Sequence, residues 1–268
     1  MGVETFITIC IYTMAAILGL CVGSFLNVVI YRLPRGMSLF RPGSHCPTCG
    51  YTLKWYDLIP VLAYILLGGR CRICRGKISS RYMLVEIANC LLWVLSVWVF
   101  WQQSPIYALA AAIISSVLIC LFFVDLEHMI ILNRFSITVA VAGVAVMLVD
   151  NTTVWYDHII GMVAGLVVFM ALYYGSIAVL HQEGMGLGDV KYAAAAGLAL
   201  GWQRFILAML VASVLAAVVM IVSNRVQKAD KRTEHPFGPF LALGTLVALF
   251  AGDVVIDWYI GFLFSQLI

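Results

Sequence analysis

The sequence predicts an all-α, polytopic membrane protein with about eight transmembrane helices and one small polar loop domain after the first helix. Hydrophobic residues make up 63% and charged residues 11% of the 268 residues, whereas soluble domains contain about 25% charged residues. Mean hydropathy is +1.03. The apolar runs are also continuous, as membrane helices of about 20 residues require. A β-barrel would instead show alternating segments of about ten residues.

The chain divides into a first apolar run, a polar segment and seven further apolar runs. The first run, about 6–31, is followed by Arg32 and Arg35 and has no basic residue before it. This order is the reverse of a cleavable signal peptide, so we expect a retained helix with its N-terminus outside. A 12-residue apolar stretch in the polar segment, 58–69, is too short to span and is expected to be interfacial or partly buried. The later runs lie near 83–101, 105–124, 135–149, 158–180, 190–201, 205–223 and 237–257.

The placement of basic residues predicts which segments face the cytoplasm. Only Arg204 among the 16 lysines and arginines lies outside four polar segments. Basic residues collect on the cytoplasmic side of membrane proteins. The segments expected on that side are 32–81, 125–134, 182–191 and 223–235.

The polar segment contains two CxxC pairs, Cys46–Cys49 and Cys71–Cys74, separated by 21 residues. Each pair can present two thiolates to one ion, and two pairs complete the tetrahedral S4 arrangement of structural zinc sites. Disulfides are not expected in a reducing cytoplasm. The sequence therefore predicts Zn²⁺ bound by Cys46, Cys49, Cys71 and Cys74. A dithiol redox centre and four unmetallated thiols are the alternatives.

Two aspartates lie at the edges of predicted spans. Asp125 ends one apolar run, and Asp189 opens another after the glycine-rich segment Gly184–Gly188. Two predicted spans separate them, so both are expected on the cytoplasmic side. Two carboxyl groups brought together share one proton. One can then act as a general base on water and the other as an acid, which is the chemistry of aspartic peptidases. Alternatively, each aspartate caps a helix or pairs with a nearby base such as Lys191.

Four blocks of sequence, in order, resemble the type IV prepilin peptidases, the bifunctional leader peptidase/N-methyltransferases. GxGD alone is a weak signal, but together the blocks extend over nearly the whole chain and are very specific. One departure is Leu132, which stands in a segment where this family usually has a proline. The blocks are GSFLNVVIYRLP at Gly23–Pro34, the loop from Cys46 to Glu86, DLEH at Asp125–His128, and GLGDVK at Gly186–Lys191 followed by PFGPFL at Pro236–Leu241.

The resemblance implies an inner-membrane aspartic endopeptidase with Asp125 and Asp189 as its catalytic residues. Its substrates would be type IV prepilins or pseudopilins, cleaved after the glycine that ends a short basic leader. The family also implies N-methylation of the new N-terminal residue with S-adenosylmethionine as co-substrate. The sequence lacks the glycine fingerprint of a Rossmann-type cofactor domain. Candidate contacts to the methyl donor, by resemblance, are Gly23, Asn27, Arg32 and Pro34.

The expected organisation is a first transmembrane helix at 1–31, a cytoplasmic zinc and methyltransferase-associated domain at 32–81, and a transmembrane peptidase domain at 82–268. We expect a multi-pass protein of the bacterial inner membrane, with its active site facing the cytoplasm. Its partners would be prepilins and the lipid bilayer, and not nucleic acid. The alternative functions are a GxGD peptidase that acts on other leader peptides without methylation, a thiol–disulfide redox protein that uses the CxxC pairs, and a transporter. The absence of repeated inverted halves disfavours the transporter.

Overall fold

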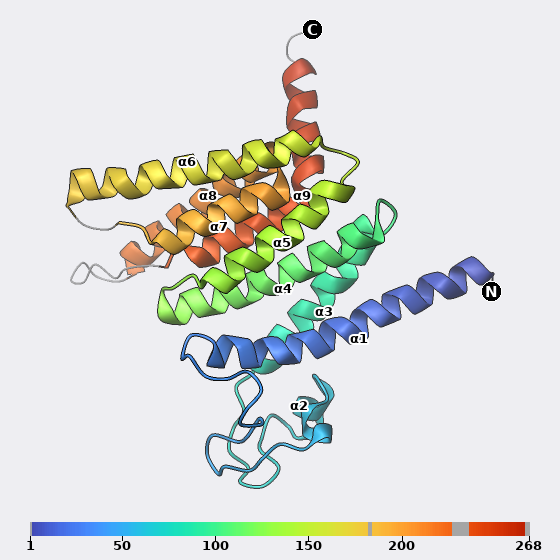
Figure 1. Cartoon of the computed structure of the whole chain (residues 1–268). Helices are drawn as coiled ribbons and strands as arrows, with labels where there is room; N and C mark the ends of the chain where they lie inside the picture. Colours follow the sequence, from blue (N-terminus) through green and yellow to red (C-terminus); the bar gives the residue numbers. More distant parts are fainter. Residues whose placement is uncertain (1, 182–183, 227–235, 266–268) are drawn as a thin grey trace. The chain divides into compact units, whose positions relative to one another are not determined.

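The computed structural model describes residues 2–181, 184–226 and 236–265, and this part of the chain contains helices and loops but no strand. Each of the eight predicted apolar runs is one helix (Figure 1). The all-α class is therefore confirmed. The expected cytoplasmic segments 182–191 and 223–235 lie partly outside the described residues. The eight helices are α1 (Val3–Arg32), α3 (Arg81–Phe100), α4 (Pro105–His128), α5 (Asn133–Val149), α6 (Trp155–Leu180), α7 (Leu187–Leu200), α8 (Trp202–Val226) and α9 (Gly238–Ser265).

Helix length separates these eight helices into two groups. Six helices in the described part of the chain, namely α1, α3, α4, α6, α8 and α9, are long and apolar enough to cross a bilayer. Helix α5 has 17 residues and helix α7 has 14. A helix rises about 1.5 Å per residue, so α7 extends about 21 Å, less than the hydrocarbon core of about 30 Å. The protein is a multi-pass membrane protein, and a total of eight crossings stays a prediction.

The chain forms two compact units, Met1–Val99 and Phe100–Ile268. In the first unit, glycines allow α1 to pack closely against α3. A Cβ atom at Gly19 would lie 2.9 Å from the Cα atom of Cys90, and one at Gly23 would lie 2.8 Å from that of Glu86. Small residues at such interfaces let two helix backbones approach each other.

The predicted interfacial stretch 58–69 contains only short helices. A 3₁₀ helix spans Trp55–Leu58, and α2 spans Leu62–Leu66. None of the residues in α2 is buried, and its leucine and isoleucine side chains are 58–84% exposed. This stretch therefore does not form a membrane-crossing helix.

In the second unit, α7 contacts α5, α6, α8 and α9 (Figure 1). A Cβ atom at Gly197 would collide with the carbonyl group of Gly161 in α6. The fully buried Tyr192 donates a 2.7 Å hydrogen bond from its hydroxyl group to Thr245 Oγ1 in α9. These contacts hold the short helix that begins with the GxGD segment among four neighbours.

Arg204, the one basic residue outside the expected cytoplasmic segments, is 3% exposed. Its Nε and Nη2 atoms donate hydrogen bonds to the two carboxylate oxygens of Asp253 at 2.6 and 2.7 Å. Its Nη1 atom donates to the Tyr107 hydroxyl group at 2.7 Å and to Asp150 Oδ2 at 3.4 Å. The Arg204 guanidinium group is thus buried and paired inside the protein. This pairing explains why Arg204 can lie outside the segments that contain the other basic residues.

Candidate functional site

Asp125 lies in the last turn of α4. The helix ends at His128, and its C-cap residue, Met129, has a left-handed backbone with φ of 53° and donates its N–H to the Asp125 carbonyl oxygen at 2.8 Å. The Asp125 residue is 5% exposed. Its Oδ2 atom accepts a 2.8 Å hydrogen bond from the N–H group of Gly238, the first residue of α9. A Cβ atom at Gly238 would lie 2.5 Å from this oxygen, so the close approach requires glycine.

Asp189 lies in the first turn of α7. The N-cap residue is Gly186, and Asp189 is the third helical residue, whose Oδ2 atom accepts the Gly186 N–H at 3.2 Å. The helix-capping role considered for Asp189 is therefore present, as one hydrogen bond of its side chain. Asp189 is half-buried, and its carboxyl group lies close enough to that of Asp125 for the two to repel each other when both are ionised. The fold therefore brings two carboxyl groups, 64 positions apart in the sequence, within electrostatic reach of each other.

The loop between α4 and α5 borders this pair. A Cβ atom at Gly188 would lie 3.0 Å from the carbonyl oxygen of Ile131, so the loop lies directly against the start of α7. Leu132 has φ of −75°, which is inside the range that a proline ring imposes. The leucine thus keeps a backbone conformation that proline also adopts. The buried His128 Nε2 atom has no hydrogen-bond partner among the described residues and lies 4.0 Å from Glu127 Oε2.

Lys191, the alternative base for Asp189, is bonded elsewhere. Its Nζ atom donates a 3.0 Å hydrogen bond to Asn133 Oδ1. Sequence analysis did not single out Asn133 or Gly238 as site residues. Gly238 belongs to the PFGPFL block, which was the only sequence signal for it, and nothing in the sequence pairs Asn133 with Lys191.

The two CxxC pairs form two turns with the same backbone pattern. The residue that follows each pair has a left-handed conformation, with φ of 72° at Gly50 and 57° at Arg75. In the second turn the left-handed residue is Arg75, and the glycine, Gly76, follows one position later. Each turn is closed by an isolated β-bridge, His45–Thr52 in the first and Arg70–Lys77 in the second.

The four cysteine sulfur atoms form one cluster. The Sγ atoms of Cys46 and Cys74 are 3.8 Å apart and those of Cys49 and Cys71 are 4.0 Å apart, and all four lie within 4.8 Å of one another. Tetrahedral zinc with Zn–S bonds of about 2.3 Å requires sulfurs about 3.8 Å apart. The backbone N–H groups of Cys49 and Thr48 lower the pKa of the Cys46 thiol to about 6. The Gly76 N–H acts in the same direction on Cys74, but burial and the other three thiols raise the pKa of Cys74 to about 11. The cluster can therefore hold a metal ion.

Asp57 connects the two turns of the cysteine cluster. Its Oδ1 atom accepts a 2.8 Å hydrogen bond from Arg72 Nε, and its Oδ2 atom accepts one of 3.1 Å from the Tyr51 hydroxyl group. Desolvation opposes ionisation, but the hydrogen bonds from Arg72 and the Lys54 N–H hold the pKa of Asp57 below its usual value. The ionised Asp57 side chain thus connects Tyr51, which lies just after the first CxxC pair, to Arg72, which lies within the second pair.

The candidate methyl-donor residues lie toward the C-terminal end of α1. Gly23 packs against α3, and Pro34 is half-buried in the turn after α1. The Asn27 amide group is 5% exposed and donates a 3.1 Å hydrogen bond to the carbonyl of Tyr82. The Arg32 guanidinium group is buried and donates to three loop carbonyls at 3.0–3.4 Å. The polar groups of Asn27 and Arg32 are thus engaged within the protein.

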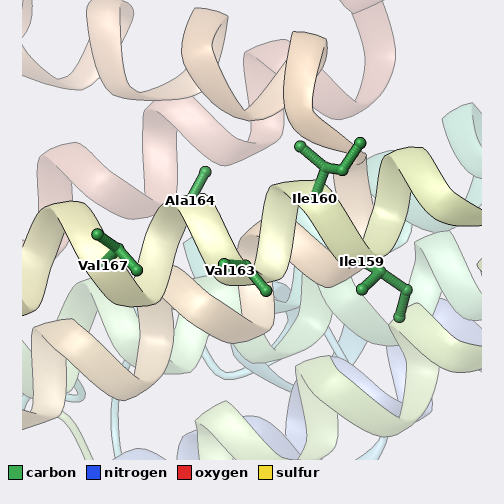
Figure 2. Close-up of a pocket in the computed structure, with 5 residues that line it drawn as sticks. All are labelled: Ile159, Ile160, Val163, Ala164 and Val167. Atoms are coloured by element: carbon green, nitrogen blue, oxygen red, sulfur yellow. The ribbon is translucent and has the colours of Figure 1, made fainter.

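A separate hollow lies on the surface of α6 (Figure 2). Its side chains contain only carbon, and the helix is long and apolar enough to cross a bilayer. No group there can perform acid–base chemistry, and such a surface suits contact with lipid. The lining residues are Ile159, Ile160, Val163, Ala164 and Val167.

Comparison with known proteins matches both units. Residues 17–100 match the bacterial peptidase A24 N-terminal domain, and residues 112–221 match the type IV leader peptidase family. The chain is 33%, 34% and 31% identical to proteins named prepilin leader peptidase/N-methyltransferase from Aeromonas hydrophila, Stutzerimonas stutzeri and Pseudomonas aeruginosa, respectively. These alignments cover 92–93% of this chain and 92–93% of each relative. No solved structure matches the chain.

Proposed function

Because the chain belongs to the type IV leader peptidase family, we propose that it cleaves type IV prepilins or pseudopilins and N-methylates the product. It is a peptidase with methyltransferase activity. Cleavage follows the glycine that ends a short basic leader. The observation that carries the peptidase proposal is the approach of Asp125 and Asp189, whose carboxyl groups lie within electrostatic reach of each other.

The proposed mechanism is that of an aspartic peptidase, in which the two carboxyl groups share one proton. One carboxylate takes a proton from a water molecule, and the water oxygen bonds to the scissile carbonyl carbon. The other carboxyl group donates its proton to the carbonyl oxygen. The carbon–nitrogen bond then breaks as the carboxyl group that took the water proton gives it to the leaving nitrogen, which becomes the free N-terminus of the mature pilin. A hydroxyl proton of the intermediate returns to the other carboxylate, so that the carbonyl group forms again and the pair again shares one proton. The Gly238 N–H holds Asp125 in place for these transfers.

Membrane orientation is part of the proposal. We place the N-terminus outside and both aspartates at the cytoplasmic edge of an inner membrane. The distribution of lysine and arginine supports this orientation, and the pairing of Arg204 with Asp253 accounts for its one exception. In this orientation the apolar helix of a pilin precursor would lie in the bilayer while its leader junction meets the aspartates.

The segment 32–81 is proposed to hold one structural Zn²⁺ through its four cysteines. Four protein ligands leave no open position for water, so the ion would organise the loop and take no part in hydrolysis. We place the peptidase domain at 82–268, after the first helix at 1–31.

The methyl donor, S-adenosylmethionine, would supply the methyl group that the new N-terminal nitrogen receives. We place its site near the end of α1, where Gly23, Asn27, Arg32 and Pro34 lie. The bonds that Asn27 and Arg32 make to backbone carbonyls suit residues that shape this region and hold its loop.

The test is mass spectrometry of a pilin precursor co-expressed with the enzyme. Wild-type enzyme should remove the leader and add one methyl group. Asp125→Asn and Asp189→Asn should each lower cleavage by about 10³-fold or more, because each removes one member of the acid–base pair. Asp257→Asn, at an exposed position on α9, is the matched control and should keep wild-type cleavage.

The aspartic mechanism and two of the alternative functions, the peptidase without methylation and the redox protein, have distinct outcomes in this experiment. Cleavage by both asparagine variants at the wild-type rate would exclude the aspartic mechanism. Leader removal without added methyl mass would favour a peptidase without methylation. A redox protein would leave the precursor intact. Its four cysteines would instead alternate between free thiols and disulfides.

A further inference from the structure

Lys191 connects the two segments that carry the candidate carboxyl groups. It lies two residues after Asp189 in α7, and its Nζ atom donates a 3.0 Å hydrogen bond to Asn133 Oδ1. Asn133 is the first residue of α5, which follows Asp125 after a short loop. The bond therefore joins the start of α5 to the first turn of α7.

A second contact lies on the other side of Asp189. The Gly188 backbone approaches the loop so closely that a Cβ atom there would lie 3.0 Å from both the carbonyl oxygen and the Cβ atom of Ile131. Gly188 precedes Asp189, and Lys191 follows it. The loop that leaves Asp125 is thus attached to the Asp189 segment both before and after the carboxyl group.

We propose that Lys191 and Asn133 are positioning residues that hold the first turn of α7, and with it Asp189, at its working distance from Asp125. This inference rests on the proposed function. The first N–H groups of a helix have no partner within the helix, so its first turn is its least constrained part. Rates of acid–base reactions fall steeply when catalytic groups are displaced by about 1 Å. The hydrogen bond between the exposed side chains of Lys191 and Asn133 adds a constraint from outside the helix to this turn.

The experiment measures leader cleavage in detergent for Lys191→Met, Asn133→Ala and the double variant. Each single change should lower kcat about tenfold with little change in KM. The double variant should be no slower than the slower single variant, because both remove the same bond. Asn133→Asp keeps an acceptor oxygen and should stay within about threefold of wild type. Arg134→Met removes a neighbouring exposed charge and should keep the wild-type rate.

Several results would overturn the proposal. These are a wild-type rate for either single variant, a double variant whose loss is the product of the single losses, and a change confined to KM. The last result would make Lys191 a contact for the substrate. An equal loss in Arg134→Met would indicate a general effect of charge.

Hydrogen exchange of the full chain separates this inference from the proposed function. In Lys191→Met, amides of residues 129–135 and 186–191 should exchange about fivefold faster than in wild type. Unchanged exchange would refute the contact even if cleavage is lost. If Asp125→Asn retains activity, the aspartic mechanism fails, and the exchange result still decides whether Lys191 holds the two segments together.

Discussion

Gly238 controls the position of the Asp125 carboxyl group although it has no functional group of its own. Its N–H donates to Asp125 Oδ2 at 2.8 Å. An added Cβ atom would lie 2.5 Å from the same oxygen and 2.7 Å from the carboxyl carbon. Real Cβ atoms do not approach other atoms so closely, so the carboxyl group would have to move. A buried carboxyl group at the end of a packed helix has little room for such a shift.

Gly238→Ala should therefore lower kcat for leader cleavage by about 100-fold, through displacement of Asp125. Gly175→Ala is the matched control, because an added Cβ atom there has no neighbour within 4 Å. Both variants should be assayed on the same precursor, with the amount of inserted protein determined by immunoblot. Equal rates for the two variants would show that Asp125 does not depend on the glycine.

The four-cysteine segment is an element that a metal ion can stabilise. It contains a five-residue α-helix, a four-residue 3₁₀ helix and no buried residue in either. Its two turns are tied by Asp57, which bonds Arg72 and Tyr51. Few apolar contacts are thus available, and a bound ion would cross-link the turns in the folded state, as in small zinc domains.

Cys49→Ser should reduce bound zinc more than tenfold, because one of four thiolate ligands is lost. The same change should accelerate proteolysis of the loop in the membrane-inserted protein. Cys21→Ser, at an exposed cysteine outside the cluster, should alter neither readout. Zinc content is measured by atomic emission on purified protein. A wild-type protein that holds no zinc and forms disulfides between the pairs would instead support the redox alternative.

At the scale of the whole molecule, the two candidate sites belong to different compact units. The cysteine cluster lies in Met1–Val99 and the two aspartates lie in Phe100–Ile268. The second unit also contains a polar cluster around Arg204, which bonds Tyr107 of α4 and Asp253 of α9. The side chain of Asp150 in this cluster is fully buried and that of Asp253 is half exposed. Arg204 thus joins three helices and compensates a buried carboxylate.

Arg204→Met should destabilise the second unit by about 3 kcal/mol, because Asp150 would lose its buried cationic partner. The expected readout is a lower midpoint of thermal unfolding in detergent. Arg134→Met, at an exposed position, should leave the midpoint unchanged. If the two variants unfold at the same temperature, the cluster does not stabilise the unit.

Much of the helical framework could be predicted because a lipid environment imposes a long, local sequence pattern. Each apolar run became a helix, from the first at Val3–Arg32 to the last at Gly238–Ser265. The cysteine cluster was predictable for a similar reason, because each CxxC pair is a local sequence pattern that is typical of metal sites. The short runs at 135–149 and 190–201 already indicated short helices, which α5 and α7 are. Whether they cross the bilayer was less accessible, because hydropathy alone does not separate a membrane span from a shorter buried helix.

The sequence by itself determined the class of protein, the order of its helices and the residue types available for chemistry, because these properties depend on local composition and spacing. Only the tertiary structure decided which distant residues meet. It brought Asp189 within electrostatic reach of Asp125, joined Lys191 to Asn133 and engaged Asn27 and Arg32 with backbone carbonyls. Such contacts arise from the packing of helices against one another, and packing depends on the shapes of all neighbouring side chains at once.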